Sequence, residues 1–126
     1  MKVKTDTKER FHVITVLEPK LSASMTGEME GSLVPYLQND VKNLVVNFNE
    51  VQEMDSKAAQ KLVEIQQLFY ENQSSFVICQ VQEAVEQFLE DEELLDLMNV
   101  TPTESEAYDI VQMEELEREL LSDDDM

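Results

Sequence analysis

Short apolar runs alternate along this chain with segments of helical periodicity, and this alternation limits the possible folds more than any other feature. The runs at 43–49 and 75–80 contain consecutive apolar residues without polar alternation, which is typical of strands covered on both faces. Between them, residues 56–72 repeat apolar side chains three and four positions apart, the pattern of an amphipathic helix. This succession predicts an α/β fold with a mixed sheet, mostly parallel beyond its first strand, and helices packed on it.

The other segments complete the predicted order β, β, α, β, α, β, α, β, α. Residues 2–6 and 11–17 read as a hairpin around a turn at 6–9, and residues 23–39 as a helix that Pro35 breaks or kinks. We expect a helix over 82–90 that 92–98 extends or repeats, an edge strand at 100–102, and a last helix from a Thr103–Glu106 capping box to about Leu121. The sheet then has four to five strands and about four helices, in a single domain over 1–121 followed by a disordered acidic tail at 122–126.

The net charge of −19 is concentrated in the C-terminal part of the chain. Residues 1–81 hold 11 acidic and 8 basic residues, whereas residues 82–126 hold 17 acidic residues and one base, Arg118. Phosphate contacts need clustered Lys and Arg, so this balance argues against nucleic acid and against an anionic membrane surface. The acidic half is either a solvated surface that keeps the protein soluble or a surface that contacts a basic partner.

Apolar runs in this chain are far shorter than the roughly 18 residues of a membrane span, and the N-terminus has no apolar stretch of signal-peptide length. The single cysteine, Cys79, lies in an apolar run and cannot form an internal disulfide. These features predict a cytoplasmic protein with a buried thiol. We expect the protein to be a monomer or a weak homodimer.

Residues for catalysis are not assembled in any recognisable pattern. The only histidine, His12, lies inside a predicted strand, and nothing in the sequence brings it near Cys79. No Cys/His spacing resembles a zinc site, the acidic runs lack the glycine of a calcium loop, and the two glycines, Gly27 and Gly31, cannot form a phosphate-binding loop. We therefore expect no enzyme activity, no metal and no cofactor.

One junction stands out, where the predicted strand at 43–49 leads through a short turn to Asp55 and Ser56 at the start of the predicted helix. Both residue types are among the best helix N-caps, because their side-chain oxygens accept hydrogen bonds from free backbone N–H groups. The sequence alone therefore explains the pair by capping.

The junction also resembles the signature of the STAS domain family, which includes bacterial anti-sigma factor antagonists. The resemblance is carried by the strand Leu-Val-Val-Asn-Phe at 44–48, the step Met54-Asp55-Ser56 and the Ala- and Leu-rich helix that follows. It extends over nearly the whole chain, from the opening hairpin to Glu106-Ala107 at the last helix. The resemblance implies a β-sheet core with helices on one side.

For function, the resemblance implies a regulatory binding module in which Ser56 is the phosphoacceptor of an anti-sigma factor with serine-kinase activity. Asp55, Lys57, Leu21 and Ser22 would then surround the switch and contact the partner. Lys57 and Ala58 stand where the family usually has Ser or Thr and then Gly. The second strand of the family commonly ends in Gly-x-Leu-Asp, and of these residues the chain has only the leucine, Leu21.

Two functions are compatible with these observations. The first is an anti-sigma factor antagonist that works by partner switching, controlled by phosphorylation of Ser56. The second is an adaptor of the same fold without phosphorylation, which binds a basic partner through acidic residues at helical spacing: Glu83, Glu86, Glu90 and Glu93.

Overall fold

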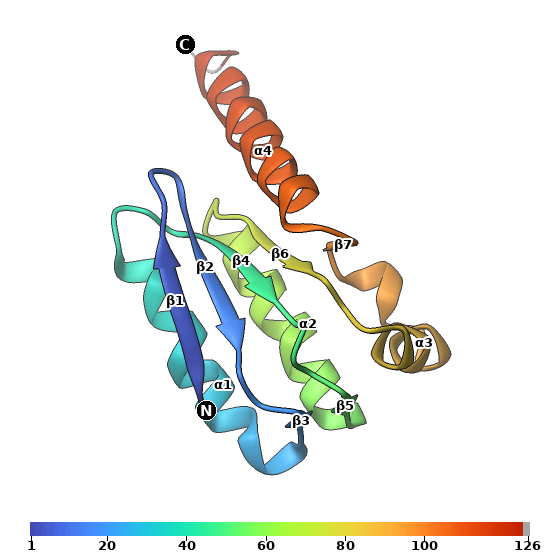
Figure 1. The fold of residues 1–126 in the computed structure, drawn as a ribbon. Coiled ribbons are helices and arrows are strands. Elements are labelled where there is room, and N and C mark those ends of the chain that lie inside the picture. Colours follow the sequence, from blue (N-terminus) through green and yellow to red (C-terminus); the bar gives the residue numbers. More distant parts are fainter. Residues whose placement is uncertain (125–126) are drawn as a thin grey trace.

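The computed structural model describes the backbone of residues 1–124 and the side chains of residues 1–121. Its main sheet has five strands in the order β1-β2-β4-β6-β7 (Figure 1). These strands are β1 (Val3–Thr7), β2 (Phe11–Val16), β4 (Asn43–Asn47), β6 (Phe76–Cys79) and β7 (Val100–Thr101). Only β1 and β2 pair antiparallel, and the other neighbours are parallel. The predicted mixed sheet, its hairpin and its edge strand are therefore confirmed.

The helices follow the predicted order, with two of them interrupted. They are η1 (Ala23–Met25), α1 (Thr26–Leu33), η2 (Val34–Gln38), α2 (Ser56–Glu71), α3 (Glu83–Asp91), η3 (Leu95–Leu97) and α4 (Glu104–Asp124). Pro35 lies in the first turn of η2, where its missing N–H leaves no helical hydrogen bond unmade. Glu93 has a φ of 59°, and this left-handed residue ends α3 and separates it from η3.

A second, two-stranded sheet was not predicted. Strands β3 (Lys20–Leu21) and β5 (Glu53–Met54) pair in parallel beside the start of α2. Strands of two residues are too short to show the alternation by which strands are recognised in a sequence. This small sheet places the segment after β2 next to the segment after β4.

Both faces of the main sheet are covered, and this corrects the one-sided arrangement implied by the family resemblance. Leu44 and Val46 belong to a core cluster with apolar residues of α1, α2 and α3. Val45 belongs to a second cluster with Phe11, Val13, Val77, Cys79, and Ala107 and Val111 of α4. Because successive strand residues point to opposite faces, the unbroken apolar runs of β4 and β6 require a cover on each side.

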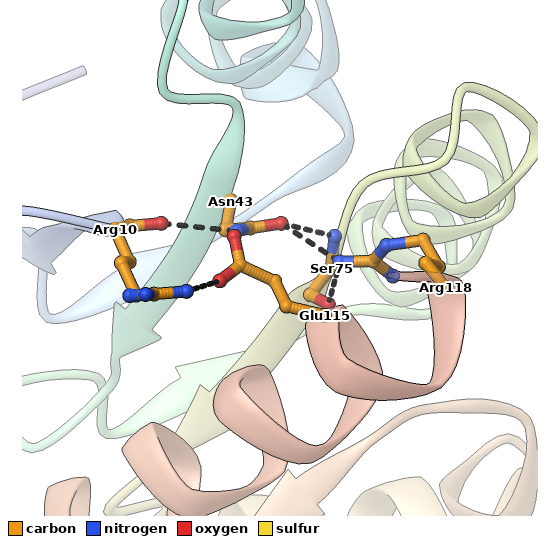
Figure 2. A network of polar contacts seen from close by, with 5 residues as sticks. All are labelled: Arg10, Asn43, Ser75, Glu115 and Arg118. Atoms are coloured by element: carbon orange, nitrogen blue, oxygen red, sulfur yellow. Dashed lines mark hydrogen bonds and ion pairs between the residues drawn. The ribbon is translucent and has the colours of Figure 1, made fainter. Parts of the chain in front are cut away.

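Helix α4 is fastened to the second face by polar contacts as well as by Ala107 and Val111. Figure 2 shows Glu115 bonded to Arg10 and Asn43, and Arg118 bonded to Asn43 and Ser75. Nearer the start of α4, Glu104 accepts a 2.9 Å hydrogen bond from the Asn47 side chain. Helix α4 is thus hydrogen-bonded to both ends of β4.

The C-terminal end of α4 extends further than the sequence indicated. The helix continues to Asp124, whereas its capping and periodicity placed its end near Leu121. The remaining residues of the predicted acidic tail, 125–126, lie outside the described part of the chain. Within the described residues, none of the helices has the length and apolar character required to cross a bilayer.

The placement of α4 can be tested by truncating residues on its two sides. Val111 is fully buried against the sheet, whereas Met113 is 60 % exposed. We expect Val111→Ala to lower the free energy of unfolding by about 2 kcal/mol, because it removes two buried methyl-sized groups. Met113→Ala should change it by less than about 0.5 kcal/mol. Urea unfolding measures both, and equal losses for the two variants would contradict the packing.

Candidate functional site

The junction between β4 and α2 lies at the carboxyl ends of the parallel strands. After β4, Phe48 and Val51 are buried and close a turn through a 3.0 Å backbone hydrogen bond. Strand β5 then pairs with β3, and the Asp55 N–H donates to the Leu21 carbonyl at 3.0 Å. The small sheet therefore fixes the position from which α2 begins. In open α/β sheets, this edge is where ligands and partners usually bind.

The Asp55 carboxylate joins two segments that are far apart in the sequence. Its Oδ1 accepts from the Ala58 N–H at 3.0 Å, which makes Asp55 the N-cap of α2 as predicted. Its Oδ2 accepts from the Ala23 N–H at 2.7 Å, at the start of η1. The backbone hydrogen bonds from Ala58 and Ala23 lower the pKa of Asp55, because they stabilise the charged form. The carboxylate is thus a structural bridge at the centre of the site.

Ser56 is the first residue of α2 and its side chain is half-buried. Its hydroxyl donates a hydrogen bond to the Glu92 carboxylate, at the end of α3. This contact connects the start of α2 to α3, and Glu92 is exposed to solvent on its other side. A negative charge placed on Ser56 would therefore lie beside an existing one.

The other predicted site residues take different positions around this pair. Lys57 is exposed, and Ser22 is half-buried, with its hydroxyl 3.0 Å from that of Ser24. Leu21 is only 1 % exposed and lies in the core cluster. Its backbone carbonyl, which binds the Asp55 N–H, positions the site. The structure thus brings Ser22, Asp55 and Ser56 together, with Lys57 facing solvent and Leu21 beneath.

An open, partly apolar cleft of about 290 Å³ lies next to the junction, between β5 and α3. Its residues are Gln52, Glu53, Met54, Ala84, Val85 and Phe88. The cleft can take an apolar side chain of a partner that also contacts the start of α2.

Cys79 and His12, the only residues of a conceivable nucleophile pair, lie on opposite faces of the sheet. Cys79 belongs to the cluster under α4, whereas the His12 ring contacts that of Tyr36, which packs against the cluster on the other face. The His12 Nε2 donates to the Val41 carbonyl at 3.1 Å, and its Nδ1 lies 2.9 Å from the Thr7 hydroxyl. Burial raises the pKa of the Cys79 thiol to about 12, so the thiol is protonated at neutral pH.

Metal binding has no support in the described part of the chain. Among these residues, no three His, Cys, Asp or Glu side chains are grouped so that they could hold a metal ion.

Comparison with known proteins identifies the family. The sequence profile of the STAS domain matches residues 2–107, which is most of the chain. The chain belongs to the STAS domain family. Some solved structures with this fold are described as anti-sigma factor antagonists. Among curated protein sequences, none matches this chain.

Solved STAS structures share the fold at low sequence identity. The protein TM1081 of Thermotoga maritima has a TM-score of 0.73 at 18 % identity, over 87 % of this chain and 94 % of its own. A serine-to-glutamate variant of Moorella thermoacetica RsbS has a TM-score of 0.73 at 22 % identity, over 94 % and 99 %. The Bacillus antagonist SpoIIAA in its phosphorylated form has a TM-score of 0.61 at 16 % identity, over 87 % and 99 %. These likenesses establish the STAS fold of the chain.

Two features of the site were not found in the sequence. Glu92 lies 36 residues from Ser56, and as one member of a long acidic run it carried no sign of that contact. The second hydrogen-bond donor to Asp55 is the backbone N–H of Ala23. A sequence does not reveal such a contact, because it does not depend on the type of residue that donates. One signal in the sequence could have suggested Glu92: it is an acidic residue directly after the helix that precedes the edge strand.

The role of Asp55 as a charged bridge predicts a pH-dependent stability. Its pKa is lower in the folded protein than its ordinary value, so its contribution is present above about pH 4 and is lost as the pH falls through the folded pKa. Asp55→Asn keeps a capping oxygen but offers an N–H₂ where the Ala23 N–H needs an acceptor. We expect the variant to be less stable at pH 7 and the difference from wild type to narrow below about pH 4.

Urea unfolding at several pH values measures this difference. Asp109→Asn is the matched control, since Asp109 is an exposed carboxylate on α4. A gap between wild type and Asp55→Asn that stays constant with pH would contradict the bridge.

Proposed function

We propose that this chain is an anti-sigma factor antagonist that works by partner switching, with Ser56 as its phosphorylated control residue. The observation that carries the proposal is the Ser56 hydroxyl, which lies half-buried at the start of α2 and is bonded to Glu92. The family and the fold support a regulatory binding role. The proposed unit is residues 1–121, in the cytoplasm, with a serine-kinase-like anti-sigma factor as the partner.

In the unmodified state, the partner would bind the surface around the start of α2. Ser22, Ser56 and Lys57 offer polar contacts there, and the cleft beside Met54 and Phe88 offers an apolar one. Such a combination of an apolar pocket and a polar rim is typical of protein interfaces.

Phosphorylation would change this surface by charge. Transfer of a phosphoryl group from ATP to the Ser56 Oγ replaces the hydroxyl proton, so the hydrogen bond to Glu92 is lost. The phosphate brings about −1.5 to −2 charges. The N-terminal N–H groups of α2 favour an anion, but Asp55 already accepts one of them and Glu92 lies beside the serine. Repulsion should therefore move Glu92 away from the phosphorylated Ser56. The partner would then lose its contacts with the surface around the start of α2.

A second candidate function is an adaptor that binds a basic partner without phosphorylation. The observation that favours it is a polar hollow of about 350 Å³ that Glu86, Glu90, Glu93 and Asp96 line together with Leu95. Glu83 is exposed on α3, the helix that also carries Glu86 and Glu90. An adaptor held by these charges would lose affinity steeply as salt rises, whereas a switch would respond to Ser56.

The proposal predicts one phosphate per chain, on Ser56. After incubation with ATP and a purified serine-kinase-like anti-sigma factor, intact-mass measurement should show a single phosphate on wild type and none on Ser56→Ala. In binding assays with that partner, Ser56→Asp should weaken the complex at least tenfold, because a buried charge in an interface costs several kcal/mol unless it is paired. Ser105→Asp, the same change at an exposed position of α4, should leave binding unchanged.

The absence of phosphate on wild type, together with unchanged binding of Ser56→Asp, would refute the switch. Binding that is lost with salt in both proteins would then favour the adaptor.

The role of Glu92 gives a prediction that needs no partner. Ser56→Asp should be less favourable for stability in the wild-type background than in a Glu92→Gln background, because two carboxylates face each other only when Glu92 is present. A double-mutant cycle by urea unfolding should give a coupling of about 0.5 kcal/mol, the range of exposed charge pairs. Zero coupling would mean that Glu92 does not sense the charge on residue 56.

A further inference from the structure

The C-terminal half of α4 presents a row of large apolar side chains to solvent. Met113, Leu116 and Leu120 are 60, 56 and 56 % exposed, and Leu121 beside them is 64 % exposed. The spacing of three and then four residues places the first three in one line along the helix. We call Met113, Leu116 and Leu120 the α4 ridge. Four large apolar side chains gathered on one short helical stretch are more than the scattered ones of an ordinary surface.

The α4 ridge points away from the sheet because the opposite side of the helix is hydrogen-bonded to other parts of the fold. Glu114 accepts hydrogen bonds from the Tyr70 and Ser75 hydroxyls at 2.8 and 2.6 Å. Glu115 and Arg118 make the contacts of Figure 2, with Arg10, Asn43 and Ser75. With 100° between successive helical residues, Val111, Glu114 and Arg118 lie opposite the ridge. Rotation of α4 to bury the ridge would break this whole network.

The ridge lies outside the part of the chain that the family profile covers, which ends at residue 107. Figure 1 shows the C-terminal turns of α4 projecting past the β1–β2 turn, at the end of the molecule opposite β3, β5 and the start of α2. A partner on the ridge would therefore not compete for space with a partner at Ser56.

The charges beside the ridge select the occupant. Glu117 and Glu119 flank it and are exposed, while Arg118, the one base of residues 82–126, is turned toward Asn43 and Ser75. A second copy of this chain would bring the same glutamates against them, with a net charge of −19 on each copy. Like charges in the flanking positions of paired helices oppose association, whereas opposite charges favour it.

We infer that the α4 ridge is a docking surface for an amphipathic helix of a partner protein whose own apolar stripe is flanked by Lys and Arg. Burial of the leucines supplies the affinity, and Glu117 and Glu119 select a basic partner. This surface is independent of Ser56, so a partner could stay on the ridge while another is exchanged at the start of α2.

The full chain can be tested with a defined probe, a synthetic four-heptad peptide with Leu at the a and d positions and Lys at e and g. Fluorescence anisotropy measures its binding, and a peptide with Glu in place of each Lys is the charge control. The variant Leu116→Ser/Leu120→Ser removes the two leucines of the ridge without changing the charge. Leu97→Ser is the matched control, because Leu97 is an equally exposed leucine, 53 %, on η3. Circular dichroism verifies that each variant is folded.

We expect wild type and Leu97→Ser to bind the Lys peptide equally, and Leu116→Ser/Leu120→Ser to bind it at least tenfold more weakly, since each buried leucine contributes more than a tenfold change. Glu117→Gln/Glu119→Gln should also weaken binding, and the Glu peptide should not bind. Ser56→Asp should bind the Lys peptide as wild type does, even if the switch at Ser56 fails its own test.

Three results would overturn the inference. Equal binding of wild type and the ridge variant would mean that charge alone attracts the peptide. A dimer of the chain alone in sedimentation velocity, dissolved by Leu116→Ser/Leu120→Ser, would mean that a second copy occupies the ridge. Altered peptide binding by Ser56→Asp would mean that the two surfaces are not independent.

Discussion

The burial of β4 on both faces is the constraint on which the rest of this structure depends. Its five residues are all buried, with Leu44 and Val46 toward α1 and α2 and Val45 toward α4. The strand also begins and ends with buried asparagines, and an unsatisfied amide there would cost about 1–3 kcal/mol. Asn43 donates to Glu115 at 2.6 Å and Asn47 donates to Glu104 at 2.9 Å, so both ends of the strand fasten α4. The position of α4 thus follows from the burial of β4 and from the hydrogen bonds that its two asparagines require.

The same strand connects the two sites proposed above. At its carboxyl end, the chain passes through the β3–β5 pair to Asp55, whose carboxylate holds the Ala23 and Ala58 N–H groups and so fixes Ser56 in place. At its amino end, the network around Asn43 holds the C-terminal half of α4 with its apolar ridge outward. A sheet that supports both the proposed phosphorylation site and the proposed docking surface would suit a protein that exchanges one partner while it keeps another.

Much of the fold could be predicted, because the signals for it are local. The hairpin, the buried strands, the α2 helix and its Asp55 cap follow from periodicity and from which oxygens can accept free N–H bonds. The misses have physical reasons. The β3–β5 pair is too short to form a pattern, and Leu21, a match to the family motif, is buried, so it acts through its carbonyl. The periodicity of α4 indicated a helix, but it could not indicate which face of the sheet that helix covers.

The sequence by itself determined the order of the elements, the two-sided burial of the central strands, the cap at the start of α2 and the crowding of negative charge after residue 81, since each depends on neighbours along the chain. Only the tertiary structure decided that Glu92 lies against Ser56, that Cys79 and His12 lie on opposite faces, and that the leucines of α4 point to solvent. These depend on contacts between residues far apart in sequence. Such contacts are set by how the helices pack on the sheet, and composition and periodicity do not encode that packing.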